Sequence, residues 1–206
     1  MRLTNDGRNT SMAENTEKTL KTREVRAFGF VGAEAVRTLT EKLSDLAEED
    51  AREPIRLAMA CYGNAWISSQ AFHDYVRTMA VPLDTCALGC VEGSALLVFA
   101  SGRQRLAAVG TVFSFTRYKI WFEKEDLDVV ELAQKAQIAK QAEWNAAKSI
   151  ARASGLSAEV VLEMFRQGVV LSVKEALDQG LVTGTLEDGV QERLKVETGQ
   201  VSVAVC

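Results

Sequence analysis

The chain has 206 residues, a formal net charge of −4 and a hydrophobic fraction of 47%, which suits one compact domain with a sizeable core. The mildly acidic balance gives no electrostatic reason to expect nucleic acid or an anionic membrane as a partner. No apolar run approaches the roughly 20 residues of a membrane helix, and the polar N-terminal part lacks the apolar stretch of a secretory signal. We therefore expect a cytoplasmic protein.

Three regions follow one another along the chain. Residues 1–24 are rich in Asn, Thr, Lys and Glu, which predicts a disordered polar segment in which Met12 is an alternative start to Met1. Residues 25–186 form the predicted domain, where strand-like and helix-like segments alternate and favour an α/β fold with a largely parallel sheet. The expected order is strand 25–32, helix 33–50, strand 55–60, helix 67–79, strand 84–89, helix 91–101 and strand 105–115.

The longest helix signal covers residues 126–154 and stops before Gly155. Apolar residues recur there at steps of three or four and form one stripe. At about 1.5 Å per residue this helix spans roughly 40 Å, so we expect part of it to project or to pack on another subunit. The stripe comprises Val129, Leu132, Ala136, Ala139, Ala142, Ala146 and Ile150.

Two short helices are predicted after the long one. Ser157 is a capping-type residue, and Ser172 with Glu175 fits a capping box. The third region, the tail 187–206, is expected to be weakly structured, with at most a terminal strand at 201–205.

The four cysteines show no metal-ligand spacing. Cys86 and Cys90 are four residues apart, but no second Cys or His pair accompanies them, so we expect neither a metal site nor a cofactor. We interpret these two, together with Cys61 and Cys206, as buried, reduced thiols of a cytoplasmic protein.

Four strings of sequence carry a resemblance to a known family. In chain order they are RLAMACYGNA at 56–65, FHDYVRTM at 72–79, CALGCVEGSALL at 86–97 and LSVKEALDQGLV at 171–182. They resemble the proteolytic subunits of the Clp protease (ClpP), where a strand runs into a Ser-Pro-Gly-Gly turn, a helix follows, a glycine-containing stretch carries the nucleophile, and a Ser-Ala-x-Glu-Ala motif lies near the end. The similarity covers about residues 25–183 and implies a ClpP/crotonase-like ββα spiral with a long handle helix.

The resemblance also implies that the Ser-His-Asp triad is absent. It assigns the nucleophile position to Gly93, the histidine position to Phe115 or Thr116, and the aspartate position to Gly168. Glycine has no side chain to attack a carbonyl, and neither Phe115 nor Thr116 can accept a proton from a serine near neutral pH. We therefore expect no conventional serine peptidase, and leave open whether the chain is an enzyme.

The family binds the oxyanion of its tetrahedral intermediate with two backbone amides. The matching positions here are Asn64, where the family has its second turn glycine, and Ser94. Backbone donors survive side-chain changes when the turn survives, so a vestigial oxyanion pocket is expected. Ser94 lies one residue after the nucleophile position, and one step along a helix turns a side chain by about 100°. We therefore expect the Ser94 side chain to point away from the groove.

Other groups remain candidates for a rebuilt chemistry, each beside a simpler reading. His73, the sole histidine, is either a relocated base or a helix-surface or interface residue. Glu92 is either an acid or base beside the oxyanion amides or a turn glutamate. Cys61 and Cys90 are potential nucleophiles, although no neighbouring histidine activates them. Ser114 or Ser94 with Lys119 would form a Ser-Lys pair, a known variant of the triad.

Two functions stay open on the sequence. The first is a structural or regulatory ring component, either a homo-oligomer or a mixed ring with an active ClpP paralogue, as a heptamer or double heptamer to which a Clp-type ATPase could bind. Residues 118–124 (YKIWFEK) replace the family's usual glycine-rich stretch, which puts the double-ring contact in doubt. The second is an enzyme with hydrolase or crotonase-like acyl chemistry that uses the surviving oxyanion amides.

Overall fold

In the computed structural model, residues 23–119 and 126–187 are described. The predicted N-terminal segment, up to residue 22, and the predicted terminal strand at 201–205 lie outside the described residues. None of the helices within the two described ranges combines the length and the apolar character needed to span a bilayer.

The described chain forms one mixed sheet, largely parallel as the alternating pattern predicts. β1, β2, β3, β4 and β7 pair in that order, all in parallel, whereas β5 pairs with β3 beyond the end of β4 and β6 runs antiparallel to β5. The strands are β1 (Glu24–Val31), β2 (Ile55–Gly63), β3 (Leu83–Gly93), β4 (Arg105–Ala107), β5 (Val112–Ser114), β6 (Val170–Ser172) and β7 (Gly184–Thr185).

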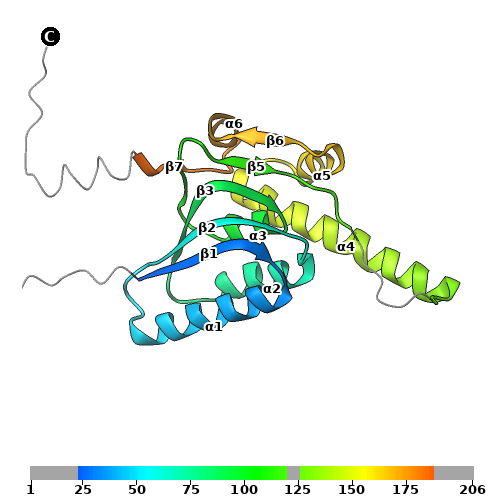
Figure 1. Cartoon of the computed structure of the whole chain (residues 1–206), viewed down its shortest axis with the longest axis horizontal. Coiled ribbons are helices and arrows are strands. Elements are labelled where there is room, and N and C mark those ends of the chain that lie inside the picture. Colours follow the sequence, from blue (N-terminus) through cyan, green and yellow to red (C-terminus); the bar gives the residue numbers. More distant parts are fainter. Residues whose placement is uncertain (1–22, 120–125, 188–206) are drawn as a thin grey trace, which may run out of the picture.

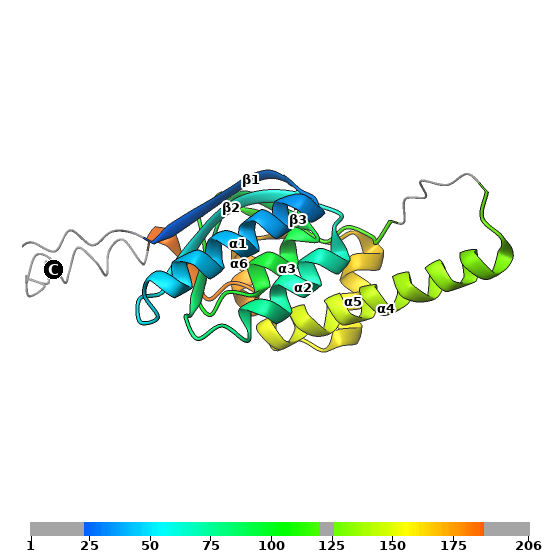
Figure 2. The ribbon, with the colours of Figure 1, turned by 90° about the horizontal axis from the view of Figure 1, so that it is seen from below.

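Helices cover one face of the sheet at β1, β2 and β3 and leave the other face open (Figures 1 and 2). Along β1 and β2 the side chains alternate between the two faces, as the pleat of a strand requires. Phe28, Phe30 and Tyr62 consequently lie on the open face, where each is more than half exposed. The helices are α1 (Ala33–Glu49), α2 (Trp66–Val76), α3 (Ala95–Ala100), α4 (Val129–Ser154), α5 (Ala158–Gln167) and α6 (Val173–Asp178).

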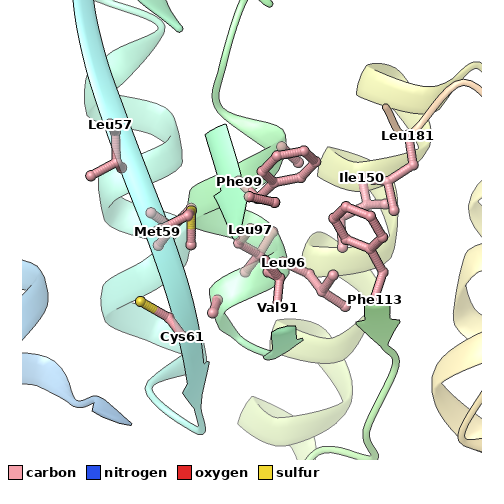
Figure 3. Close-up of a cluster of buried hydrophobic side chains, with 14 of the residues drawn as sticks. Leu57, Met59, Cys61, Val91, Leu96, Leu97, Phe99, Phe113, Ile150 and Leu181 are labelled. Carbon is pink, nitrogen blue, oxygen red and sulfur yellow. The ribbon is translucent and has the colours of Figure 1, made fainter. Parts of the chain in front are cut away.

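The core lies between the sheet and the helices α3 and α4 (Figure 3). All six residues of α3 are buried, because this short apolar helix is enclosed by the sheet, α2 and α4. The rings of Phe99 on α3 and Phe113 on β5 pack at a centroid distance of 5.1 Å, beside Ile150 of α4. Burial of such side chains supplies most of the stabilisation of a domain of this size.

The third strand is longer than predicted, and this matters for the site. The sequence predicts a strand that stops at Gly89 and a helix from residue 91, but β3 continues to Gly93 and α3 begins only at Ala95. Gly89 has a φ of 77°, and β3 changes partner there, from β4 before it to β5 after it. The glycine therefore produces an irregularity within the strand, and Glu92 and Gly93 lie at the end of a strand instead of inside a helix.

The long helix α4 confirms the predicted projection. It begins after Asp128, whose carboxylate accepts the Glu131 N–H at 2.8 Å in a capping box, and it ends at Gly155 with a φ of 79°. Its buried residues are confined to the C-terminal part, from Ala146 to Ala151, whereas Val129 at the other end is 84% exposed. Figure 2 shows the N-terminal part of α4 extending away from the body.

A buried arginine joins three helix ends. Arg105, 8% exposed, donates from its guanidinium to the carbonyls of Leu181 at 2.8 Å, Gly102 at 3.0 Å, Ala153 at 2.7 Å and Gly180 at 3.1 Å. These carbonyls follow α3 and α6 or belong to the last turn of α4, where helix dipoles favour a cation. Burial lowers the pKa of Arg105 from its ordinary value, and the four hydrogen bonds of its guanidinium are all made to neutral carbonyls.

Candidate functional site

The three positions that the resemblance assigns to the triad meet at the carboxyl ends of β2, β3 and β5. Gly93 closes β3 opposite Gly63 of β2. A Cβ placed on Gly93 would lie 2.8 Å from Thr116 Oγ1, and one placed on Gly168 would lie 3.9 Å from the Phe115 carbonyl oxygen. The architecture thus brings Gly93, Thr116 and Gly168 into one small region, although none carries an acid, a base or an activated nucleophile.

Thr116, and not Phe115, faces Gly93. The Phe115 ring is 1% exposed and packs on Phe165 of α5 at a centroid distance of 5.1 Å. The Phe115 N–H donates to the Val169 carbonyl at 2.8 Å, which holds the segment after β5 against the segment after α5. Of the two residues that the sequence leaves open, the structure therefore sends Phe115 into the core and Thr116 towards the site.

The region around Gly93 has no room for a side chain. A Cβ on Gly93 would approach the Gly63 carbonyl oxygen to less than 3.0 Å, closer than real Cβ atoms come to other atoms, and Gly93 has a φ of 63°, which favours glycine. A serine at this position would need the ends of β2 and β3 to separate.

The backbone amide expected to bind an oxyanion is already occupied. The Ser94 N–H donates to the Gly63 carbonyl at 3.0 Å. This bond corrects the expectation of two free amides: one of the pair is used to close β2 against β3. A ligand oxygen at that position would have to displace the bond.

The side chain of Ser94 serves the fold. It is 0% exposed, and its Oγ accepts the Ala65 N–H at 3.0 Å, at the start of α2. This agrees with the expectation that it points away from the groove. Ser94 is therefore available neither as a nucleophile nor as the serine of a Ser-Lys pair.

Asn64 ties the same turn to the segment after β5. Its Oδ1 accepts the Trp66 Nε1–H at 2.7 Å and its Nδ2 donates to the Lys119 carbonyl at 3.1 Å. The Trp66 indole is 3% exposed and packs edge-on against Phe165. The sequence did not reveal this tie, since a tryptophan two residues after an asparagine is no specific signal. Lys119 enters it through its backbone.

Glu92 and Cys90 lie on the open face of the sheet. Val91 between them is fully buried on the helix side, so the pleat directs its two neighbours to the other side. Glu92 pairs in register with Tyr62 of β2 and Ser114 of β5. Burial, and secondarily the charge of Glu92, raise the pKa of the Cys90 thiol, which keeps it protonated and poorly nucleophilic.

Cys61 lies in the core and is no nucleophile, contrary to the candidate role given to it. It is 2% exposed, its Sγ is 3.0 Å from the Ala27 carbonyl oxygen, to which it donates, and Figure 3 places it among the core side chains. Burial raises the pKa of its thiol to about 11. The reactive thiolate is therefore absent at neutral pH.

The two thiols differ in a way that alkylation can measure. In the folded protein near neutral pH, iodoacetamide will modify Cys90, which is partly exposed, well before Cys61. Peptide mapping after timed quenching gives both rates, and a sample unfolded in urea provides the control in which the two react alike. Equal rates in the folded protein would contradict the burial of Cys61.

His73 is buried, which corrects its reading as a helix-surface residue. It is 4% exposed on α2, two helical turns beyond Trp66, or about 10 Å at 1.5 Å per residue. The group beside its ring is Asp74, with Oδ1 3.4 Å from Nδ1, and not a group at Gly93 or Thr116, so His73 is not placed there as a base. Among residues 23–119 and 126–187, no three His, Cys, Asp or Glu side chains gather in a way that could hold a metal ion.

Comparisons with known proteins agree with this architecture. The sequence model of the family described as Clp protease matches residues 7–188. Among solved structures, the crystal structure of a peptidase from Plasmodium falciparum superimposes with a TM-score of 0.70 at 16% sequence identity, over 80% of this chain and 95% of that one. At that sequence identity the structural likeness establishes the fold alone. The search of curated proteins finds no significant match to the sequence. Since the family model covers most of the chain and the fold agrees with it, the chain belongs to the Clp protease family.

Proposed function

We propose that this chain is a subunit that does not cut peptide bonds and that contributes structure or regulation to a Clp-protease-type ring. The observation that carries this proposal is the meeting of Gly93, Thr116 and Gly168 at one place with no titratable group among them to activate the Thr116 hydroxyl. A serine nucleophile needs an adjacent base, and the base needs an orienting group.

The closure between β2 and β3 supports the same proposal. The Gly63 carbonyl occupies the space beside Gly93 and accepts the Ser94 N–H at 3.0 Å. Catalysis of acyl transfer depends on donors that stay free for the developing oxyanion. The rebuilt acyl chemistry that the sequence left open would therefore lack one of its two expected donors.

Two exposed apolar surfaces support assembly. One is the open face of the sheet with Phe28, Phe30 and Tyr62, and the other is the projecting part of α4 with Val129 and Leu132. Contiguous apolar surface of this kind marks contacts with other proteins. Members of the family usually form rings, and we propose that this subunit joins copies of itself or an active paralogue in a heptameric ring, in the cytoplasm and with a Clp-type ATPase as a further partner.

Peptide and acyl-thioester hydrolysis tests the catalytic half of the proposal. A panel of fluorogenic peptides and acyl-thioesters will show no turnover above buffer for the wild type. A Glu92→Gln variant, with an unchanged melting profile as its control for folding, will behave identically. Turnover by the wild type that disappears in Glu92→Gln would contradict the proposal and identify Glu92 as a catalytic group.

Native mass spectrometry tests the assembly half. The chain has a mass of 22.5 kDa, and we expect particles at ring-sized multiples of it, or mixed particles when an active paralogue is added. A protein that stays monomeric both alone and with the paralogue would overturn the assembly half and leave the catalytic half intact.

A further inference from the structure

The outer edge of β1 is a strand edge that pairs with no other strand in the described part of the chain. Along its other edge β1 bonds to β2 (Figure 1). The Arg56 N–H donates to the Arg23 carbonyl at 2.9 Å, so Arg23 and every second residue after it direct their backbone groups to β2. The residues between them therefore direct their backbone N–H and C=O groups outwards, and these are Glu24, Arg26, Phe28 and Phe30.

This edge lacks the features that usually keep the edge of a sheet from pairing. Proteins protect such edges with proline, with lysine or with other charged side chains. β1 contains neither proline nor lysine, and its two charges, Glu24 and Arg26, neutralise each other in an ion pair at 2.7 Å. The first irregularity along the strand is Gly29, whose φ is 90°. The part of the edge that suits pairing therefore comprises residues 24–28.

A groove follows the same edge. It is lined by three consecutive residues of β1 and by side chains of α1. Consecutive strand residues point to opposite faces, so a groove that touches all three of them follows the edge of the strand, and β2 occupies the other edge. Towards the helices the groove is apolar, since Val25 is 7% exposed and Leu46 packs against the core. The lining residues are Glu24, Val25, Arg26, Lys42, Asp45 and Leu46.

The C-terminal tail has the residues and the length to occupy this edge. Residues 201–205 (VSVAV) are predicted to form a strand, with three valines on one side and small residues on the other. The paired residues across the sheet place Thr185 of β7 level with Ala27 of β1, four strand spacings or about 19 Å away. Residues 188–200 between them span up to about 45 Å when extended, so the tail can reach the outer edge of β1.

We propose that residues 201–205 add a strand to the outer edge of β1 in the same chain, pairing with residues 24–28 and placing their valines in the groove beside Leu46. In strand addition of this kind main-chain hydrogen bonds supply the affinity and alternate side chains supply the specificity. The added strand closes the edge to other chains and leaves the exposed aromatic side chains of the open face available for assembly. The inference goes beyond the proposed function and does not depend on it, since it concerns one chain only.

Amide hydrogen exchange at single-residue resolution tests the added strand, with a variant of the tail for comparison. The double variant Ser202→Pro, Val203→Pro removes a donor to β1 in any register, because one of two consecutive strand residues always faces the partner strand. In the wild type the outward N–H groups of Arg26 and Phe28 will exchange at least about fivefold more slowly than in this variant, a factor that a single hydrogen bond supports.

Two controls make the test specific. The N–H groups of Val25 and Ala27 point to β2 and will stay protected in the wild type and in the variant. The matched variant Lys195→Pro, Val196→Pro, in the part of the tail that only connects, will keep the slow exchange of the wild type at the outward N–H groups.

Equal exchange of the outward N–H groups in the wild type and in the double variant of residues 202 and 203 would overturn the inference. Rapid exchange in both would mean an uncovered edge, and slow exchange in both would mean that another segment covers it. Protection that is lost on dilution would assign the strand to a neighbouring copy and would refute pairing within one chain. Native mass spectrometry reports on the ring separately, so failure of the ring and failure of the added strand remain distinguishable.

Discussion

Gly93→Ser will lower the free energy of unfolding by about 3 kcal/mol and will not create a protease. The new Cβ would lie less than 3.0 Å from the Gly63 carbonyl oxygen and 2.8 Å from Thr116 Oγ1. A left-handed conformation costs a residue other than glycine about 1–2 kcal/mol, and overpacking adds about 1–3 kcal/mol. Both penalties apply at Gly93, whose φ is 63°.

Gly89→Ser provides the matched control on the same strand. Gly89 also has a positive φ, of 77°, but nothing lies within 4 Å of a Cβ placed there. Its substitution should cost only the conformational penalty, about 1–2 kcal/mol. Urea unfolding of both variants measures the difference, and equal losses would contradict the crowding between Gly63 and Gly93.

Rebuilding the whole triad should fail as well. The combined variant Gly93→Ser, Thr116→His and Gly168→Asp returns the three side chains, but the Ser94 N–H remains bonded to the Gly63 carbonyl at 3.0 Å. Peptide hydrolysis by a folded form of this variant would show that the closed end of β2 and β3 opens readily, against our account.

Arg105→Met will destabilise the fold by about 3–5 kcal/mol, the other large effect that we expect. The substitution keeps an unbranched apolar stem but removes the donors to four carbonyls, which belong to Gly102, Ala153, Gly180 and Leu181. Buried carbonyls that lose their donor cannot bond to water instead, and a buried polar group without a partner destabilises the folded state. Arg105→Lys will destabilise the fold less than Arg105→Met does, but it will not match the wild type, since an ammonium group cannot reproduce the planar fork of a guanidinium.

Arg103→Met is the control for this prediction. Arg103 lies two residues earlier and forms an ion pair with Asp84 at 3.0 Å, but its side chain is 53% exposed. A surface pair of this kind contributes at most about 1 kcal/mol. Urea unfolding measures both variants, and similar losses for Arg103→Met and Arg105→Met would mean that the buried hydrogen bonds contribute little.

Sequence patterns that involve residues close together in the chain predicted the structure most reliably. The serines predicted to cap helices do so: Ser157 Oγ accepts the Val160 N–H at 3.2 Å, and Ser172 with Glu175 forms the expected capping box. Capping depends on residues three apart, so the sequence contains all the information needed. The apolar run around residues 91–101 was different, because a buried strand end and a buried helix look alike in such a run.

The candidate site was predictable only in outline. The resemblance identified Gly93, Gly168 and one of two residues after β5, and the structure brings these positions together. The sequence could not predict that the end of β2 closes against the end of β3 at this site. That contact is made by the backbone carbonyl of Gly63, and no side-chain pattern reveals a backbone contact. Arg105 was missed for the same reason: its carbonyl partners at Ala153, Gly180 and Leu181 are 48, 75 and 76 residues away in the chain.

Labelling with a fluorophosphonate, which reacts with activated serines, tests the central claim most directly. The folded chain is incubated with the probe, its intact mass is measured, and an active serine peptidase treated in parallel confirms that the probe is reactive. Because Ser94 is fully buried and its Oγ is bonded to the Ala65 N–H, we predict an unchanged mass. A single adduct on Ser94 or Ser114 that forms in the folded protein and is lost when the chain is unfolded beforehand would contradict the claim that this subunit lacks serine-protease chemistry.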